Sequence, residues 1–326
     1  MTESRVKFIG IIASLGFAAW AAMAGAATAG PATRPANVLS RQWMPKGFHA
    51  IRDVAYVPHG RRSQMLDVYV PDIPTSPRPL MVWIHGGGWY SGDKSVPPGL
   101  GLLPRGYVVA SINYRLSGEA VFPAQIFDCK AAIRFLRAHA REYDIDPTRI
   151  GVWGDSAGGQ LAALLGTTNG RKEYEGTEGV LVPSSSVQAV CDWYGPSDFL
   201  QAADWDGTST GASAGAVRLL FGGVVSAHAQ AAALASPAEQ AGRAPLAPFL
   251  IMHGDQDQLV PLHQSQVLFQ RLQKAGGAAR LVIVHGGHGN GWFKSRDDLT
   301  TVYDFFDRCL VKSQVRASPP ATRPST

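Results

Sequence analysis

Short apolar runs alternate with amphipathic stretches along most of this chain. The apolar runs are continuous, which is typical of strands buried on both faces of a parallel sheet. They fall at residues 80–84, 107–112, 150–153, 187–191, 249–252 and 281–284. Apolar positions spaced three and four apart predict a helix over residues 126–143, and further helices are expected over 160–165, 264–274 and 299–310. This alternation predicts an α/β fold with an open, mostly parallel sheet and helices on both faces.

Residues 202–240 interrupt this alternation. The segment is rich in Ala, Gly and Ser and has no strong strand, so we expect a small cap insertion over one end of the sheet. A lid over a pocket and a plain surface excursion both remain open. In the helix predicted over 126–143, a row of basic residues shares one face, which we interpret as solvated rather than as a binding patch. The row consists of Lys130, Arg134, Arg137 and Arg141.

The two ends of the chain differ from its middle. Arg5 and Lys7 precede apolar residues 8–20, and small residues follow up to Ala29, the pattern of a signal peptide over residues 1–29. We expect cleavage and a secreted or periplasmic protein with no stable membrane span; an uncleaved anchor is the alternative. Residues 30–45 are predicted to be a linker and residues 313–326 a disordered tail. The folded domain is then 46–312.

Composition narrows the class of protein. Of the 326 residues, 45% are hydrophobic and 17% are charged, which excludes intrinsic disorder. The net charge of +5 is not gathered into a basic stripe, so we expect no nucleic-acid partner. The three cysteines, Cys129, Cys191 and Cys309, lack metal-ligand spacing, and we expect no metal site. Their odd number predicts a free thiol or an intermolecular bridge, while one disulfide of undetermined pairing remains open.

The strongest local motif is Gly-Asp-Ser-Ala-Gly-Gly at residues 154–159. It lies between the strand predicted at 150–153 and the helix predicted at 160–165. A sharp strand–turn–helix of this kind holds its central residue in strained geometry, with the side chain projecting above the sheet. The helix N-terminus favours a developing oxyanion. Ser156 is therefore the predicted nucleophile, and it needs a base that is oriented by a carboxylate.

Candidates for the carboxylate follow a later strand, in the chain order serine, acid, histidine. Asp255 and Asp257 come directly after the run at 249–252, where α/β sheets place their chemistry. We favour Asp257 because it lies further from the strand end, whereas Asp255 is positioned to cap the loop. Asp198 is a third candidate.

The candidate base follows the last apolar run. His288 lies among glycines beyond residues 281–284, and we favour it as the general base. His285 abuts the strand and is expected to be a buried structural residue. His253 is interpreted as a hydrogen-bonded histidine at a strand end.

A second glycine motif, His-Gly-Gly-Gly-Trp at residues 85–89, follows the apolar run at 80–84. Consecutive glycines let backbone N–H groups point into a cavity without side-chain obstruction. Gly87 and Gly88, with the N–H of Ala157, are the predicted oxyanion hole, and His85 is expected to brace the loop. The spacing does not match that of phosphate-binding glycine loops.

Aromatic residues near these motifs are candidates for substrate binding. They are Trp89, Tyr90, Trp193, Tyr194 and Trp292. For each of them, packing in the core is an equally good interpretation. An aromatic-lined mouth suits a hydroxycinnamoyl ester or a sugar ring.

In combination, these motifs resemble the α/β-hydrolase fold, and its hormone-sensitive-lipase-like branch in particular. Further segments look like those of the bacterial feruloyl esterase-like and acetylxylan esterase-like group. The resemblance covers about residues 50–310 and rests on residues 85–94, 113–116, 122–137, 146–150 and 154–159. It implies a serine esterase with a Ser–Asp–His triad and no metal or organic cofactor. The acidic motif at 255–261 is more like that of acetyl esterases and oligopeptidase-type hydrolases, which leaves the substrate open.

The expected substrate is a small-molecule or oligosaccharide ester. The first hypothesis is a carboxylesterase for short-chain acyl or hydroxycinnamoyl (feruloyl) esters of plant cell-wall carbohydrate. The alternative is a general short-chain or lipase-like carboxylesterase acting on small extracellular esters. A non-catalytic binding protein with the same fold is a third hypothesis, and the oligomeric state is left open.

Overall fold

The computed structural model describes residues 44–74, 76–95, 97–201, 212–289 and 295–311. All of them belong to one unit of the chain, Ser40–Thr326. The predicted signal peptide, all but the last two residues of the predicted linker, the predicted tail and Trp292 lie outside the described residues.

The centre of this unit is an eight-stranded sheet in the order β1-β2-β4-β3-β5-β6-β7-β8. From β3 to β8 all neighbouring strands are parallel, and β1 and β2 are antiparallel. The strands are β1 (Phe48–Ala55), β2 (Met65–Pro71), β3 (Arg78–Ile84), β4 (Val108–Ile112), β5 (Ile145–Asp155), β6 (Ala189–Trp193), β7 (Phe249–Gly254) and β8 (Ala279–Val284). The prediction of a mostly parallel sheet is confirmed.

The antiparallel strands β1 and β2 escape the sequence pattern for two reasons. In β1, every position is half-buried or exposed because the strand lies at the sheet edge. In β2, Asp67 interrupts the apolar run, yet its carboxylate is buried. It accepts hydrogen bonds from Lys94 at 2.5 Å and Arg52 at 2.9 Å. A buried charge is tolerated here because it is paired.

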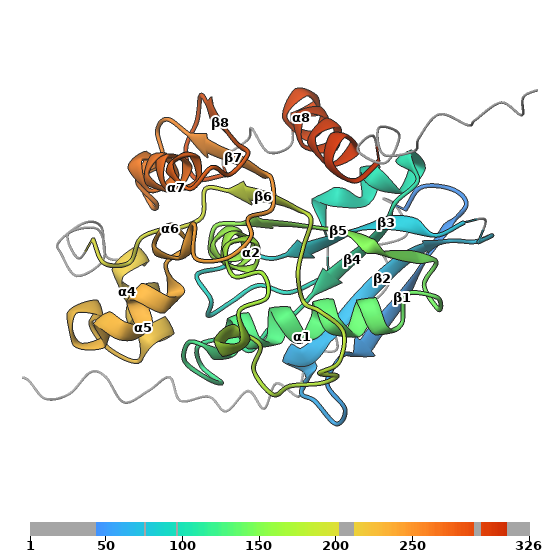
Figure 1. Ribbon diagram of the computed structural model, residues 1–326, viewed down its shortest axis with the longest axis horizontal. Helices are drawn as coiled ribbons and strands as arrows, with labels where there is room; N and C mark the ends of the chain where they lie inside the picture. The colour runs from blue at the N-terminus through green and yellow to red at the C-terminus, as the bar shows by residue number, and fades with distance from the viewer. Residues whose placement is uncertain (1–43, 75, 96, 202–211, 290–294, 312–326) are drawn as a thin grey trace, which may run out of the picture. The chain divides into compact units, whose positions relative to one another are not determined.

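Helices cover both faces of the sheet, as the sequence predicts (Figure 1). On one face lie α1 (Ala124–Ala138), α2 (Ala157–Thr167) and α7 (Leu262–Lys274), which pack on aliphatic side chains of the strands. On the other lie the 3-10 helix η2 (Pro98–Arg105) and α8 (Arg296–Phe306), which pack around buried tryptophans such as Trp153. After α8 the chain continues as a π-helical turn, η6 (Asp307–Val311).

The described part of the predicted insertion is helical. It contains α4 (Ala212–Phe221), η4 (Val225–His228), α5 (Ala229–Ala235) and α6 (Pro237–Gln240). By length and composition alone, Ser213–Ala235 is apolar enough to cross a membrane, with a mean hydropathy of 1.3. The sequence pattern did not predict such a segment beyond the signal peptide at residues 1–29. In the fold, however, it is broken between α4 and η4, where Gly222 has a φ of +74°.

The basic row on α1 is largely buried, so the prediction of a solvated face is wrong. Lys130 and Arg134 are buried and Arg137 is half-buried, whereas Arg141, beyond the end of the helix, is exposed. The spacing of these residues indicated correctly that they share a face. It did not indicate that another part of the chain covers that face.

The covering segment is residues 168–188, in which the only regular element is the 3-10 turn η3 (Lys172–Tyr174). Lys130 donates to the Glu175 carboxylate at 3.2 Å, and Arg134 donates to it at 2.7 Å. Arg137 donates to the Ser186 carbonyl oxygen at 2.7 Å. Irregular backbone that is buried needs partners for its carbonyl groups, and the basic side chains of α1 supply them.

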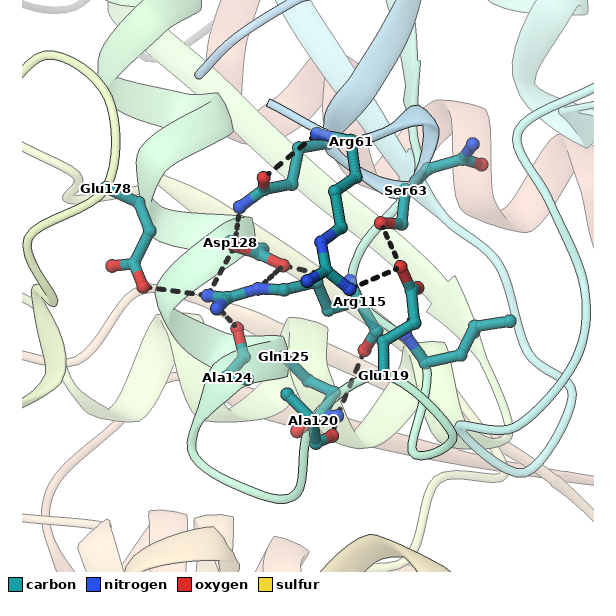
Figure 2. A network of polar contacts seen from close by, with 12 residues as sticks. Arg61, Ser63, Arg115, Glu119, Ala120, Ala124, Gln125, Asp128 and Glu178 are labelled. Atoms are coloured by element: carbon teal, nitrogen blue, oxygen red, sulfur yellow. Dashed lines mark hydrogen bonds and ion pairs between the residues drawn. The ribbon is translucent and has the colours of Figure 1, made fainter. Parts of the chain in front are cut away.

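A second polar network, around Arg115, connects α1 to the loop that follows β4 (Figure 2). The Arg115 guanidinium donates to both carboxylate oxygens of Asp128, each at 2.8 Å, and to Glu178 at 2.7 Å. Gln64 donates to the same Asp128 carboxylate at 2.9 Å. Asp128 is fully buried, and this bidentate geometry is the strongest form of ion pair.

No disulfide joins the three cysteines in the described structure. Cys129 lies on α1 and Cys191 on β6, both buried, and Cys309 in η6 is half-buried. The disulfide that the sequence left open is therefore absent from the described structure.

Candidate active site

The turn between β5 and α2 presents Ser156 at the carboxyl end of the sheet. Ser156 has a φ of +51°, a strained value for a residue with a side chain. A Cβ at Gly154 would lie 2.2 Å from the Gly158 carbonyl oxygen, and one at Gly158 would lie 2.0 Å from the Ile84 carbonyl oxygen. Only glycine fits at either position, and this explains the spacing of the motif.

Ser156 is hydrogen-bonded to a histidine from another strand end. The Ser156 hydroxyl lies 2.9 Å from Nε2 of His288, and Nδ1 of His288 lies 2.7 Å from Oδ2 of Asp257. An ionised carboxylate only accepts, so Nδ1–H of His288 donates to Asp257 and Nε2 accepts from Ser156. The fold thus brings together the three predicted triad residues, from the ends of β5, β7 and β8.

Asp257 is held by four donors. Its Oδ1 accepts from the backbone N–H groups of Leu259 at 2.8 Å and Val260 at 2.9 Å. Its Oδ2 accepts from His288 and lies 3.2 Å from Nε2 of His253. Burial alone would raise the pKa of Asp257, but the hydrogen bonds from His253 and His288 hold it well below its usual range. The carboxylate is therefore ionised throughout the neutral range.

His253 and Ser265 extend this chain of hydrogen bonds beyond Asp257. It is fully buried, and its Nε2 also lies 2.9 Å from the Val260 carbonyl oxygen. Two acceptors on one side fix the Nε2–H tautomer, so Nδ1 accepts from the Ser265 hydroxyl at 2.6 Å. The histidine is hydrogen-bonded at the strand end, as expected, and it also orients the acid, which the sequence did not indicate.

The two rejected candidates form a pair of their own. Asp255 lies 3.1 Å from Nδ1 of His285, and it accepts the Gly286 N–H at 3.0 Å. The hydrogen bond from Gly286 and that from His285 lower the pKa of Asp255. The His285 side chain is 79% exposed, so the expectation that it is buried is wrong. The third candidate acid, Asp198, instead accepts the Leu200 N–H at 2.9 Å.

The glycine loop after β3 lies beside Ser156. Gly87 and Gly88 both have positive φ, +104° and +59°, and both line the pocket. Among the described residues, neither N–H has a protein acceptor. Ala157 is the first residue of α2, where backbone N–H groups have no partner within the helix. Two of the predicted oxyanion donors, Gly87 and Gly88, thus line the same pocket as Ser156, and the third, Ala157, directly follows Ser156 in the chain.

Contacts behind the loop hold it in place. Nδ1 of His85 lies 2.8 Å from the Gly86 carbonyl oxygen, and the His85 ring stacks on Tyr114 at 4.5 Å between centroids. The Tyr114 hydroxyl donates to the His85 carbonyl at 2.9 Å, and the Ser117 N–H donates to the Trp89 carbonyl at 2.8 Å. The bracing role expected for His85 is consistent with this geometry. Burial lowers the pKa of His85, which favours the neutral ring.

A pocket of about 410 Å³ opens above Ser156. Its walls come from the glycine loop, the turn after β5, the end of β6, α4 and the loops that carry the acid and the base. The lining residues are Gly87, Gly88, Trp89, Tyr90, Asp155, Ser156, Tyr194, Pro196, Ser213, Ala216, Val217, Leu259, Val260, His288 and Gly289. Apart from Asp155 and His288, the lining side chains are uncharged, so the pocket is suited to a neutral ligand.

The predicted aromatic residues divide into three groups. Trp89, Tyr90 and Tyr194 line the pocket. Trp193 does not, because its indole is fully buried and packs edge-on against Trp153 at 4.7 Å; its assignment to the substrate site is therefore corrected. Trp292 lies outside the described residues.

Some pocket residues gave no signal in the sequence. Ser213, Ala216 and Val217 lie on one face of α4, and the Ser213 hydroxyl donates to the Leu259 carbonyl oxygen at 2.7 Å. They come from the predicted insertion at 202–240, where no sequence motif distinguishes residues that line the pocket from residues on the protein surface. In the described part of the chain, no group of three or more His, Cys, Asp or Glu side chains is arranged to hold a metal ion.

Comparison with known proteins places this constellation in a family. The BD-FAE family model matches residues 66–272, more than half of the chain, from β2 through most of α7. The chain belongs to the BD-FAE family. Its fold is that of the α/β-hydrolase esterases, as the sequence motifs suggested.

Two solved structures resemble this BD-FAE chain across most of its length. A "truncated form of carbohydrate esterase from gut microbiota" is 35% identical, with a TM-score of 0.73, over 80% of this chain and 95% of that one. A "bifunctional GH43-CE" from Bacteroides eggerthii is also 35% identical, with a TM-score of 0.72, over 79% of this chain and 35% of that one.

Among curated relatives, "Esterase LipC" of Mycobacterium tuberculosis is 33% identical over 261 residues. The match covers 74% of this chain and 62% of LipC. Matches to the other curated relatives cover between 27% and 53% of their length, for example 51% of the "probable carboxylic ester hydrolase LipM". The segment that matches this chain is therefore only part of those proteins.

Proposed function

We propose that this chain is a serine carboxylesterase that works through an acyl-enzyme. The observation that carries the proposal is the hydrogen-bonded series Ser156–His288–Asp257 beneath a pocket with free backbone donors. A hydroxyl in contact with an imidazole whose other nitrogen donates to a carboxylate is the arrangement needed for nucleophilic acyl transfer. Relatives named as esterases support the same activity.

In the proposed first step, Ser156 Oγ attacks the ester carbonyl carbon while Nε2 of His288 takes the hydroxyl proton. The Nδ1–H bond to Asp257 holds the required tautomer and stabilises the imidazolium. The carbonyl oxygen becomes an oxyanion, which the N–H groups of Gly87, Gly88 and Ala157 are positioned to bind. One such donor is worth about 3–4 kcal/mol in the transition state.

The tetrahedral intermediate then collapses. His288 donates its proton to the leaving alcohol, and Ser156 keeps the acyl group. A water molecule repeats the sequence on the acyl-enzyme, and His288 again takes and returns the proton. The acid is released and the serine is regenerated. Activity falls at acid pH because a protonated His288 cannot accept the serine proton.

The pocket supports a finer proposal for the substrate. It is small, uncharged apart from Asp155 and His288, and flanked by Trp89, Tyr90 and Tyr194. Aromatic faces suit a sugar ring or a hydroxycinnamoyl group, and the carbohydrate esterases at 35% identity support a carbohydrate ester. We therefore favour short-acyl or feruloyl esters of cell-wall carbohydrate over general small esters.

The deciding experiment compares wild type with Ser156→Ala on four substrates: p-nitrophenyl acetate, p-nitrophenyl octanoate, methyl ferulate and acetylated xylan. Wild type should cleave at least one, and the variant should fall to background, with Ser63→Ala, a serine that does not line the pocket, as matched control. A rate on octanoate above those on ferulate and acetylated xylan would replace the carbohydrate proposal by the general one. Equal rates for wild type and Ser156→Ala would contradict the esterase itself.

A fluorophosphonate probe separates the enzyme from a non-catalytic binding protein. The proposal expects covalent labelling of Ser156 with release of one leaving group per chain.

The same preparation tests export. We expect the protein in the periplasm or medium, with a mature N-terminus near Ala26 or Ala29, which mass spectrometry of the intact protein identifies.

A further inference from the structure

Asp155 is a carboxylate in the active site to which the triad gives no role. It precedes Ser156 and borders the pocket. Its Oδ1 accepts the Gly86 N–H at 2.7 Å, and it also accepts a hydrogen bond from the Tyr194 hydroxyl. None of the ion pairs among the described residues involves it. The Asp155 carboxylate is therefore stabilised mainly by neutral hydrogen-bond donors rather than by an opposite charge.

Its two hydrogen-bond partners contact different parts of the active site: Gly86 belongs to the glycine loop, and Tyr194 packs against the general base His288. Gly86 begins the glycine loop, and the carboxylate fixes the peptide that leads to Gly87 and Gly88. Tyr194 is buried, with its N–H donating to the Met252 carbonyl oxygen at 2.8 Å. The Tyr194 ring meets the His288 ring edge-on, 4.6 Å between centroids.

We propose that the ionised Asp155 side chain is a positioning residue that aligns the glycine loop through Gly86 and supports the charged His288 ring through Tyr194. The inference rests on the proposed esterase function. Hydrogen bonds to an ionised acceptor are about twice as strong as those between neutral groups. A negative charge near His288 also favours the imidazolium that forms during turnover.

The surroundings of Asp155 make this role dependent on pH. Burial raises its pKa to about 6, against smaller lowering effects of the Gly86 N–H, His288 and the Tyr194 hydroxyl. The titratable groups facing this cluster are Tyr114 on the loop after β4 and His85 on the glycine loop, which stack on each other, Tyr194 at the end of β6, and Asp257 and His288 on the loops after β7 and β8. As the pH rises through about 6, Asp155 gains the charge that the proposed role requires.

The main test is Asp155→Asn, which keeps a carbonyl acceptor for the Gly86 N–H and removes only the charge. We expect kcat to fall about ten-fold, with KM changed by less than about two-fold, since one charge-assisted interaction is lost in the transition state. The acid limb, the low-pH side of the kcat/KM profile, should move to lower pH by roughly half a unit. In this variant residue 155 no longer has to ionise, and loss of its negative charge makes the His288 imidazolium less favourable.

Tyr194→Phe is the complementary test. It removes the hydroxyl that lowers the pKa of Asp155 and keeps the ring that packs on His288. Asp155 then ionises at higher pH, so the acid limb should move upward, opposite to the shift in Asp155→Asn. A residue that only maintains structure would lower the rate in both variants without moving the limb.

Asp192→Asn is the matched control. Asp192 is buried, its pKa is likewise raised to about 6, and it lies near the end of the neighbouring strand β6, but it does not line the pocket. Its substitution should leave the limb in place. If the profile of Asp155→Asn coincides with that of wild type, the proposal is overturned. If Asp155→Asn does not fold, as judged by thermal unfolding, the shift in Tyr194→Phe decides. Failure of the esterase itself would appear separately, as undiminished activity in Ser156→Ala.

Discussion

The face of α1 and the active-site pocket both bury charged side chains, but they treat them differently. On α1, Asp128 is matched by the Arg115 guanidinium, a backbone N–H and Gln64 (Figure 2). In the pocket, Asp155 has two neutral donors and no ion pair among the described residues. Full pairing produces a rigid support, whereas incomplete pairing leaves a group free to change its charge.

The two regions are linked through the loop after β4. Arg115 anchors this loop to α1, while Tyr114 and Ser117 from the same loop hold the carbonyl groups of His85 and Trp89. The ion pair of Arg115 and Asp128 thus supports the glycine loop, which Asp155 contacts from the pocket side through Gly86. Support and chemistry are separable in this comparison, and the following substitutions test that separation.

The largest expected effect distinguishes the two Asp–His pairs on the loops after β7 and β8. Asp257→Asn should lower kcat/KM by about a thousand- to ten-thousand-fold, because the amide no longer holds the His288 tautomer or stabilises its charge. Asp255→Asn, which alters the exposed pair with His285, should stay within about three-fold of wild type. Steady-state kinetics on one chromogenic ester measures both. Equal losses would show that the acid is wrongly assigned.

Breaking the α1 network should damage stability and spare the chemistry. Asp128→Ala leaves the Arg115 charge without its main partner and should cost about 3–5 kcal/mol of unfolding free energy. The fraction that remains folded should keep kcat/KM within a few-fold. Denaturant unfolding and active-site titration on the same sample separate the two quantities. A large fall in kcat per folded site would mean that support and chemistry are not separable.

Asp192 is a buried carboxylate whose Oδ2 has no hydrogen-bond partner among the described residues. Its pKa is raised by burial from 3.8 to about 6 in the folded protein. A raised carboxyl pKa costs stability above the folded pKa and nothing below the unfolded one. Asp192→Asn should therefore raise the unfolding free energy by about 2–3 kcal/mol at pH 8. The gain should vanish below about pH 4, and a gain that persists there would contradict the explanation.

The smallest effect concerns the rim of the pocket. Tyr90 is 51% exposed and lines the opening. Tyr90→Ala should raise KM for an aromatic ester by about two- to ten-fold, the value of one exposed aromatic contact. KM for p-nitrophenyl acetate should change less than KM for methyl ferulate. An equal change for both would remove Tyr90 from the substrate contacts.

Much of the site was predictable because its motifs are local. Gly154 is dictated by close contact with the backbone of Gly158, and Gly158 by close contact with the backbone of Ile84 at the end of β3. Both constraints appear directly in the sequence as glycines at a fixed spacing from Ser156. The continuous apolar runs likewise predicted six of the eight strands. Asp67 hid β2, because a paired buried charge looks like an exposed one in a hydropathy pattern.

The errors share one cause, which is that burial depends on distant partners. Lys130 and Arg134 read as a solvated row because segment 168–188, which covers them, is far away in the chain. His285 appeared buried from its position after β8 but is exposed, and Trp193 is in the core although it lies beside Tyr194 of the pocket. Neighbouring positions in a strand end point to opposite faces, so only the sheet decides which of them faces the ligand.

By itself, the sequence determined the fold class, the strained serine turn and the residue types for an acid and a base after later strands. These follow from short-range sterics and from hydrophobic periodicity. The tertiary structure alone decided that Asp257 reaches His288 across 31 positions, that His253 contacts Asp257 and Asp155 accepts the Gly86 N–H, and that α4 forms a wall of the pocket. Those arrangements depend on which strand ends become neighbours in the sheet, because contacts between distant segments leave no local pattern in the chain.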